Sequence, residues 1–370
     1  MAFQKIKLQG SAEIGGVRMA EGSVIELDAE PNVVRFNGQK LELGLTTADV
    51  HDPTELQTYL AGYSNEEFRW QDACPVVLVD KDEDKYRTFN SDAAFKPVPV
   101  KTDDNANIPE VVVQSSLTNY KVVVRRLGAF IPDTVATQVS NPGYDVRFVH
   151  LDRAARAINM DLCLDILGPS GTGLLTTKSN WTAANATTLL ADYQWNGGSK
   201  SNPIADLRAR INASAQRITD WFMNQEIAGF MLDNPAFRDY TRAVIGDSAL
   251  NTAIKATYDA GQATIDFTVP ALGTFHVCGA KATQSDGTLA YIMPSTVIGT
   301  HNVPGSPMSP DKIATAKNFR RRGPAGNGFN TREIRLDWRG AGGTLVIAEE
   351  ASVPTFTGTI VGGYIDSVKQ

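Results

Sequence analysis

The chain has 370 residues, 42% of them hydrophobic, which is enough for two or three packed units and argues against disorder. Its formal charge of −6 disfavours a protein that wraps nucleic acid by neutralising phosphates. Three widely spaced cysteines exclude a disulfide framework or a zinc motif, and we expect no membrane span and no cleaved export signal, because long apolar runs are absent.

The first 50 residues are expected to be rich in β-structure. Val24–Leu27 and Val33–Phe36 have the composition of strands, and Asn37-Gly38 is typical of a two-residue hairpin turn. Residues 53–64 are predicted to form a short helix, because Asp52 can cap its first turn.

A long two-stranded excursion is predicted over residues 75–118. Pro75–Val79 and Pro109–Val113 have strand character, and the stretch between them is charged at first and then rich in turns. An isolated hairpin is barely stable in water, so we expect this one to lie on a neighbouring molecule.

The strand-like segment Tyr120–Ile131 leads through an Ile-Pro step to a long amphipathic helix, predicted over 144–167. The apolar positions of this helix recur in steps of three and four residues, at Phe148, Leu151, Ala155, Ile158, Leu162 and Ile166. Polar residues occupy the opposite side, at Asp152, Arg153, Arg156, Asn159 and Asp161. Gly168-Pro169 ends the helix, which would be roughly 36 Å long at about 1.5 Å per residue.

Residues 168–201 are predicted to be a loop region anchored by Trp181 and Trp195. Helices are predicted over 206–218 and from 234 to just before Gly246, with a short apolar segment at 224–230 between them. The remaining predicted elements are strands at 264–268, 274–278, 290–293, 333–338, 344–347 and 356–361.

No residue pattern in the sequence indicates catalysis or metal binding. The histidines (His51, His150, His276 and His301) lack a metal-ligand spacing, so we expect them to be structural. The glycine-rich run 168–173 resembles a phosphate loop, but it follows a helix C-terminus, where the dipole repels anions. A nucleophile elbow and a dinucleotide fingerprint are also absent, and we predict no catalytic residue, no cofactor and no metal.

Two charged clusters are the candidate functional residues. The acidic cluster consists of Asp80, Asp82, Glu83 and Asp84. It lacks the glycine and the spaced glutamate of a calcium loop, so we favour a solvated turn over a cation site. The basic cluster consists of Lys317, Arg320, Arg321 and Arg322, and it is either a solvated loop or a salt-bridge surface. A better motivated interpretation joins the two: the acidic cluster of one subunit contacts the basic cluster of the next.

The order of elements over residues 75–370 resembles that of tailed-bacteriophage major capsid proteins of the Hong Kong 97 type. In this family an extended hairpin, the E-loop, precedes a long spine helix, an axial domain and a return to the peripheral strands. Here residues 75–117 match the E-loop, and Tyr120–Asp133 matches the run into the spine helix through its Tyr, Leu and Ile-Pro. Residues 224–240, 272–280 and 289–294 resemble the axial domain.

The sequence departs from the family pattern at two places. The predicted helix stops at Gly168, just after Asp165, where family members often continue into a long helical extension. Residues 1–50 do not resemble a helical scaffolding segment, so we expect a small β insert and an N-terminal arm instead.

The resemblance implies an α+β, Hong Kong 97-like phage capsid fold with an N-terminal arm, an E-loop hairpin, a spine helix in the peripheral domain and a mixed α/β axial domain. The expected division is an N-terminal β-rich segment and arm (1–74), the E-loop (75–118), the peripheral domain with the spine helix (119–201), the axial domain (202–330) and the closing peripheral strands (331–370).

The function implied by this resemblance is that of a major head protein, a structural subunit rather than an enzyme, whose copies self-assemble into an icosahedral shell around packaged double-stranded DNA. The partners would be other copies of the chain in hexamers and pentamers, and scaffolding, portal and decoration proteins are further candidates. The subunit would contact the packaged DNA weakly and non-specifically, and it would not contact a membrane. The chain would assemble in the host cytoplasm and reside in the virion. The alternatives are an encapsulin-like shell that binds enzyme cargo and a cytoplasmic α+β enzyme.

Overall fold

The computed structural model describes residues 68–88, 116–132, 146–169, 171–246, 264–283, 287–302, 312–322, 330–336 and 342–369, and the backbone of seven short strands between residues 4 and 51. Contacts divide the chain into two compact units. The first unit comprises residues 1–64, 124–158 and 322–351, and the second comprises 65–123, 159–321 and 352–370. The predicted helix at 53–64 and the predicted strand at 109–113 lie outside the described residues.

The N-terminal segment is β-structure, as predicted. A four-stranded antiparallel sheet has the order β1-β4-β5-β6, and β2 and β3 form a separate hairpin. Their bounds are β1 Gln4–Lys7, β2 Ala12–Ile14, β3 Val17–Met19, β4 Val24–Leu27, β5 Val33–Phe36 and β6 Gln39–Glu42. Phe36 pairs with Gln39, on either side of Asn37-Gly38, so β5 and β6 are joined where the hairpin was predicted.

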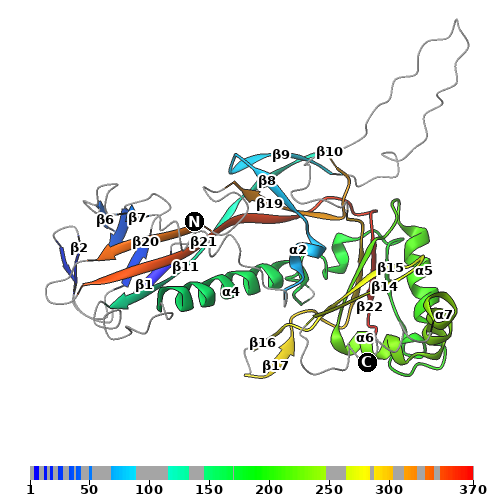
Figure 1. Cartoon of the computed structure of the whole chain (residues 1–370). Helices are drawn as coiled ribbons and strands as arrows, with labels where there is room; N and C mark the ends of the chain where they lie inside the picture. The colour runs from blue at the N-terminus through cyan, green and yellow to red at the C-terminus, as the bar shows by residue number, and fades with distance from the viewer. Residues whose placement is uncertain are drawn as a thin grey trace, which may run out of the picture. The chain divides into compact units, whose positions relative to one another are not determined.

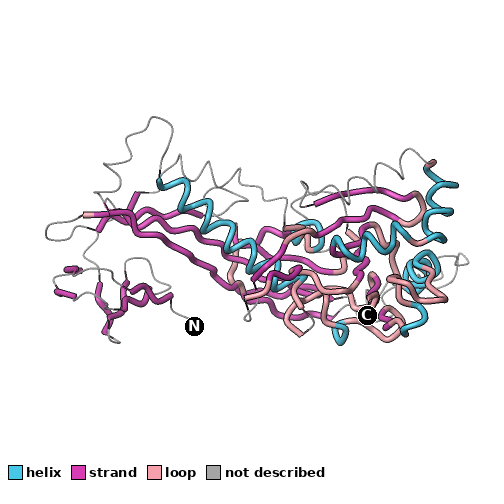
Figure 2. The backbone as a smooth tube through the Cα atoms, turned by 90° about the horizontal axis from the view of Figure 1, so that it is seen from below, coloured by secondary structure: helices cyan, strands magenta, loops and turns pink. Residues whose placement is uncertain are grey.

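Helix α4 (Val146–Leu167) is one continuous helix in Figures 1 and 2 and confirms the predicted long helix to within two residues. Leu151, Ala155, Ile158, Leu162 and Ile166 are buried, which confirms the apolar face. Asn159 was placed wrongly on the polar side. It is buried, and its Oδ1 accepts a hydrogen bond from Trp70 Nε1 at 3.1 Å, which satisfies the amide oxygen inside the protein.

The first unit contains strands β7 (Val50–His51), β20 (Asn330–Leu336), β11 (Val123–Pro132) and the first part of β21 (Gly343–Phe356). Strand β20 lies between β7 and β21 and is antiparallel to both, and β11 also pairs with β21.

The prediction of two short strands at 344–347 and 356–361 is wrong, because β21 is a single strand of 14 residues. The first part of β21 pairs with β20 and its last part with β19 (Ala316–Arg321), so one strand has partners along its whole length. The strand ends at Phe356, opposite Ala316 at the start of β19, and the chain later turns at Gly362, whose φ of 122° only glycine adopts readily. Strand β22 (Gly363–Asp366) follows this turn.

In the second unit, β19 lies between the last part of β21 and β8 (Val76–Val79), antiparallel to the first and parallel to the second. The short helix α2 (Trp70–Ala73), which the sequence did not indicate, leads directly into β8.

A second sheet in this unit has the order β12-β22-β18-β13-β15-β14. Figure 1 labels its strands β14, β15 and β22. The bounds are β12 Ala186–Thr188, β13 Asp220–Asn224, β14 Thr264–Val269, β15 Gly273–Cys278 and β18 Val297–Thr300; β16 (Lys281–Thr283) and β17 (Leu289–Tyr291) form a separate hairpin. The strands predicted at 264–268 and 274–278 are thus β14 and β15, and the one at 290–293 begins and ends earlier, as β17.

The same unit also contains the helices α5 (Pro203–Ala213), α6 (Gln225–Asp233) and α7 (Pro235–Ile245). Each begins after an asparagine whose side-chain oxygen accepts a backbone N–H of the first turn, at Asn202, Asn224 and Asn234. A proline occupies the first position of both α5 and α7. Helix α5 therefore begins at Pro203, earlier than the predicted residue 206, and it ends at Ala213 rather than at 218.

The region 171–201 is mostly loop, as predicted, with 3-10 turns at Lys178–Asn180 and Ala191–Tyr193. Both tryptophans anchor it through their indole N–H groups. Trp181 Nε1 donates to the Leu175 carbonyl and Trp195 Nε1 to Asp206 Oδ2, each at 2.9 Å. Among the described residues, no helix is long and apolar enough to cross a membrane.

The core of the second unit is built around aromatic rings on the inner strands. Phe275 is fully buried, stacks on Phe267 at 5.0 Å and meets Phe237 edge-on at 6.1 Å, measured between ring centroids. Trp221 lies beside it and packs so closely against Gly299 that a Cβ there would lie 2.7 Å from the indole.

Replacing Phe275 with alanine is expected to lower the free energy of unfolding by about 3–5 kcal/mol, because the cavity would form where no solvent can enter. Phe275→Leu, which keeps most of the volume, is expected to lose clearly less. Chemical denaturation measures both variants, and equal losses would contradict the packing described.

Candidate functional site

The root of the predicted excursion is a two-stranded antiparallel hairpin. Strand β9 (Glu83–Thr88) pairs with β10 (Ser116–Lys121), with Glu83 opposite Lys121 and Thr88 opposite Ser116. The part of the excursion between residues 88 and 116 lies outside the described residues. We call β9 and β10 the hairpin root.

Three aromatic rings hold the hairpin root on strand β19. The Tyr120 ring stacks on Phe319 with 4.6 Å between centroids, and Tyr86 packs on the same ring at 5.2 Å. All three side chains are buried, whereas most other residues of β9 and β10 are exposed. The root is therefore supported within its own chain.

The acidic cluster forms local ion pairs in this same chain. Asp82 lies 3.2 Å from Arg321 Nη1, so the structure brings one member of the acidic cluster to one member of the basic cluster. Asp84 lies 3.4 Å from Lys81 Nζ, and Glu83 pairs with Lys121 across the strands. The backbone N–H of Lys85, together with Lys81, lowers the pKa of Asp84. Asp80 is exposed.

The basic cluster is part of strand β19 and not a solvated loop. Lys317 is fully buried, and Arg320 is buried with its guanidinium 5.7 Å from the centroid of the Trp70 ring. Arg321 is partly exposed and Arg322, just beyond the strand, is exposed. The solvated-loop alternative is wrong for the first two residues, because β19 has strands on both sides.

A buried charge group in the first unit was not foreseen. The fully buried Glu349 lies 2.7 Å from Arg126 Nε and 3.6 Å from Arg332 Nη2. The three residues are on β21, β11 and β20, so only the pairing of these strands brings them together. Such a group is costly to bury unless its partners are retained.

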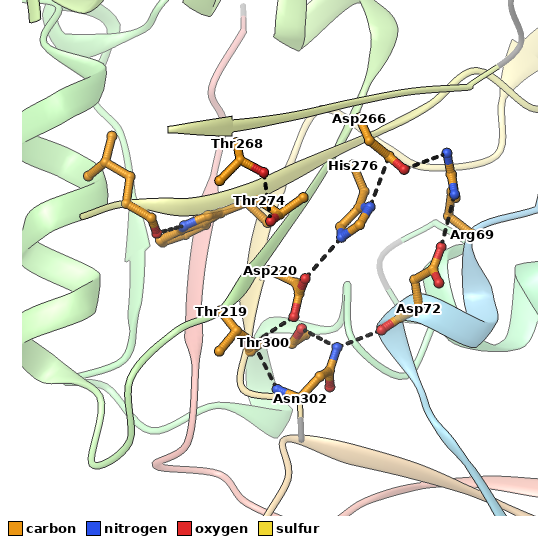
Figure 3. Close-up of polar contacts among 12 residues, drawn as sticks. Arg69, Asp72, Thr219, Asp220, Asp266, Thr268, Thr274, His276, Thr300 and Asn302 are labelled. Atoms are coloured by element: carbon orange, nitrogen blue, oxygen red, sulfur yellow. Dashed lines mark hydrogen bonds and ion pairs between the residues drawn. The ribbon is translucent and has the colours of Figure 1, made fainter. Parts of the chain in front are cut away.

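A second unforeseen group surrounds His276 on β15 in the second unit (Figure 3). Its Nδ1 lies 2.9 Å from Asp266 Oδ1 and its Nε2 lies 3.0 Å from Asp220 Oδ1. Phe222 stacks on the imidazole at 4.8 Å. Burial alone would lower the pKa of His276, but the hydrogen bonds and charges of Asp220 and Asp266 outweigh it and raise the pKa to about 9.

The partners of His276 were only partly visible in the sequence. Asp266 is directly opposite His276 in the β14–β15 pair, which the two predicted strands could have suggested once their register was known. Asp220 is 56 residues away and lies on β13, a strand that was not predicted.

The arrangement does not provide a catalytic group. Both ring nitrogens of His276 are occupied by carboxylates, so the ring has no free nitrogen to act as a general base. Cys74, Cys163 and Cys278 are buried free thiols, and burial raises the pKa of each, which makes them poor nucleophiles. Within the described part of the chain, no group of three or more His, Cys, Asp or Glu side chains could hold a metal ion.

Comparison with known proteins gives matches at the level of structure. No family model and no curated protein match the sequence. A phage-related protein from Bordetella bronchiseptica RB50 is 14% identical with a TM-score of 0.60, covering 85% of this chain and 97% of that one. A prophage protein from Escherichia coli CFT073 that was assigned as a capsid protein is 13% identical with a TM-score of 0.50, covering 86% of this chain and 99% of that one.

An encapsulin from Synechococcus elongatus PCC 7942 is 11% identical with a TM-score of 0.48, covering 82% of this chain and 89% of that one, a likeness too low to support an argument. The Bordetella and Escherichia coli structures, with TM-scores of 0.60 and 0.50, show that the chain has a mixed helix and sheet fold of the phage capsid type.

The Asp82–Arg321 pair is expected to stabilise the isolated subunit by about 0.2–1 kcal/mol, because Asp82 is 57% and Arg321 29% exposed and water screens the pair. A double-mutant cycle with Asp82→Asn and Arg321→Gln measures this coupling. Arg87→Gln, at an exposed residue of β9, is the control and should show no coupling to Asp82. Equal coupling to both arginines would contradict a specific pair.

Proposed function

We propose that this chain is a major capsid subunit of the Hong Kong 97 type, whose copies self-assemble into an icosahedral shell around packaged double-stranded DNA. The observation that carries the proposal is the fold, which is similar to a prophage protein assigned as a capsid protein over nearly its whole length. The role is structural and needs no active site.

The arrangement of elements supports this assignment. Helix α4 is the candidate spine helix, and the strands β11, β20 and β21 are candidates for the peripheral sheet. The sheet around β13 and β15, with α5, α6 and α7, corresponds to the proposed axial domain. The hairpin root begins the proposed E-loop at Glu83 and ends it at Lys121; the expected bounds of 75–118 included β8, which pairs with β19 instead.

Assembly is proposed to bury surfaces that a single subunit leaves exposed. Leu117 on β10 is 64% exposed, and other residues of the root are charged and exposed. Heterologous contacts repeated between identical subunits can close into a ring or shell. Of the charged clusters, Asp80, Asp82, Glu83, Asp84 and Arg322 are exposed and are the residues we propose for contacts between subunits.

Expression of the chain alone or with the other head proteins of its source should give closed particles visible by negative-stain electron microscopy. Nucleic acid in particles purified from infected or induced cells would support a phage head, whereas an enzyme cargo without nucleic acid would indicate an encapsulin-like shell. A small discrete oligomer as the only assembled form would contradict both.

Replacing residues 89–115 with a short Gly/Ser linker is expected to abolish shell formation while leaving a folded subunit, because the hairpin root and its aromatic contacts with β19 are retained. Circular dichroism and the thermal midpoint should stay close to those of the intact chain. Normal particles from this variant would show that the hairpin is not an assembly element.

Arg322→Glu is expected to reduce particle yield by about tenfold or more if this residue contacts the acidic cluster of another subunit, because like charges would then face each other. Lys312→Glu, at another exposed residue of the same region, is the matched control and should assemble normally. Both variants are compared by sedimentation at equal subunit concentration.

A further inference from the structure

The contacts of His276 fix its protonation state on geometric grounds. Both ring nitrogens face carboxylate oxygens, at 2.9 Å from Asp266 and 3.0 Å from Asp220. A neutral imidazole carries one N–H, so it could donate to only one of these carboxylates and would present a lone pair to the other. The two contacts are favourable together only while the ring carries its second proton.

From Asp266 the contacts continue to the segment before β8. Asp266 Oδ2 lies 3.0 Å from Arg69 Nη2, and Arg69 Nη1 lies 3.2 Å from Asp72 Oδ2. Arg69 precedes helix α2 and Asp72 lies within it. Edge strand β14 is thus joined to α2 by ion pairs.

The contacts return to His276 by another path and so form a closed ring (Figure 3). The Asp72 carbonyl accepts a hydrogen bond from Asn302 Nδ2 at 2.5 Å, and the backbone N–H of Asn302 donates to Thr219 Oγ1 at 3.0 Å. Thr219 Oγ1 in turn donates to Asp220 Oδ2 at 2.5 Å. The ring therefore links α2, β13, β14, β15 and Asn302, which lies two residues after β18.

The ring carries one net negative charge when His276 is protonated and two when it is neutral. In the protonated state three carboxylates, at Asp72, Asp220 and Asp266, face two cations, at Arg69 and His276. Loss of the proton leaves three carboxylates with one cation, and two of them lose an ion-pair partner at the same time. Because the His276 and Asp220 side chains are only 12% and 21% exposed, water replaces their interaction poorly, whereas Asp266 is 41% exposed.

We propose that this ring is a pH-gated latch: while His276 is protonated it strengthens the hold of strand β14 on the α2 segment, and loss of the proton weakens that hold. The α2 segment continues directly into β8, which leads to the hairpin root. The latch would therefore control how firmly the start of the hairpin is held. It is a property of the single subunit and does not depend on a role in a shell.

The pH range follows from the direction of each shift. The pKa of His276 is raised from 6.5 to about 9, so the stabilisation is complete below about pH 6.5 and is lost as the pH rises through 9. Burial would raise the pKa of Asp266, but His276 and Arg69 outweigh it and lower the pKa below 3.8, so its contribution is lost only in acid. The latch is closed at neutral pH and opens in alkali.

Hydrogen exchange of the intact chain tests the latch. Between pH 7 and pH 10, after correction for intrinsic exchange rates, protection of residues 69–79 is expected to fall by at least about tenfold relative to α6, the buried helix of the same unit. In His276→Gln and Asp266→Asn these residues should be weakly protected already at pH 7, with little further change. His150→Gln, at a half-buried histidine of α4, is the control and should behave like the native chain.

A titration of the native protein keeps the test independent of variants that fail to fold. With labelled histidine, nuclear magnetic resonance should show His276 with protons on both nitrogens at pH 7 and a midpoint near 9. A midpoint near 6.5, or the same loss of protection at pH 10 in native chain and His276→Gln, would overturn the proposal.

Discussion

The position of strand β19 between β8 and the last part of β21 is the constraint on which the arrangement of the hairpin root depends. The strand carries Phe319, on which Tyr86 and Tyr120 pack, so a two-stranded hairpin that would be marginal alone gains a buried apolar support. Its last residue, Arg321, pairs with Asp82 at the start of the same hairpin. The position of the hairpin root is therefore set by packing within the chain.

The same burial divides the basic cluster into two kinds of residue. Lys317 and Arg320 lie inside and contribute to the fold, since a buried cation is tolerated only where neighbouring groups replace its water. Arg322 is exposed and is the member of this cluster that we propose for a contact with another subunit. A cluster that is uniform in sequence thus has structural and surface members, and variants that change all of it at once would confuse folding with assembly.

Buried charge also organises both units in a similar manner. Glu349 is held by arginines from two neighbouring strands, and His276 is held by aspartates from two neighbouring strands. In each case the central group is costly to bury without its partners, so the contacts favour one strand register over its alternatives. Around His276 this produces a dependence on pH, because the central cation can lose its charge near pH 9.

The sequence by itself determined the elements that depend on local patterns: the face of α4, its end at Gly168, the N-terminal strands with the pairing of Phe36 and Gln39, and the loop with its two tryptophans. Only the tertiary structure decided the burial of β19, the unbroken length of β21 and the ring around His276. The physical reason is separation along the chain. Asp82 and Arg321 are 239 residues apart, and Asp220 and His276 are 56 apart, so strand pairing at long range creates contacts that no local periodicity encodes.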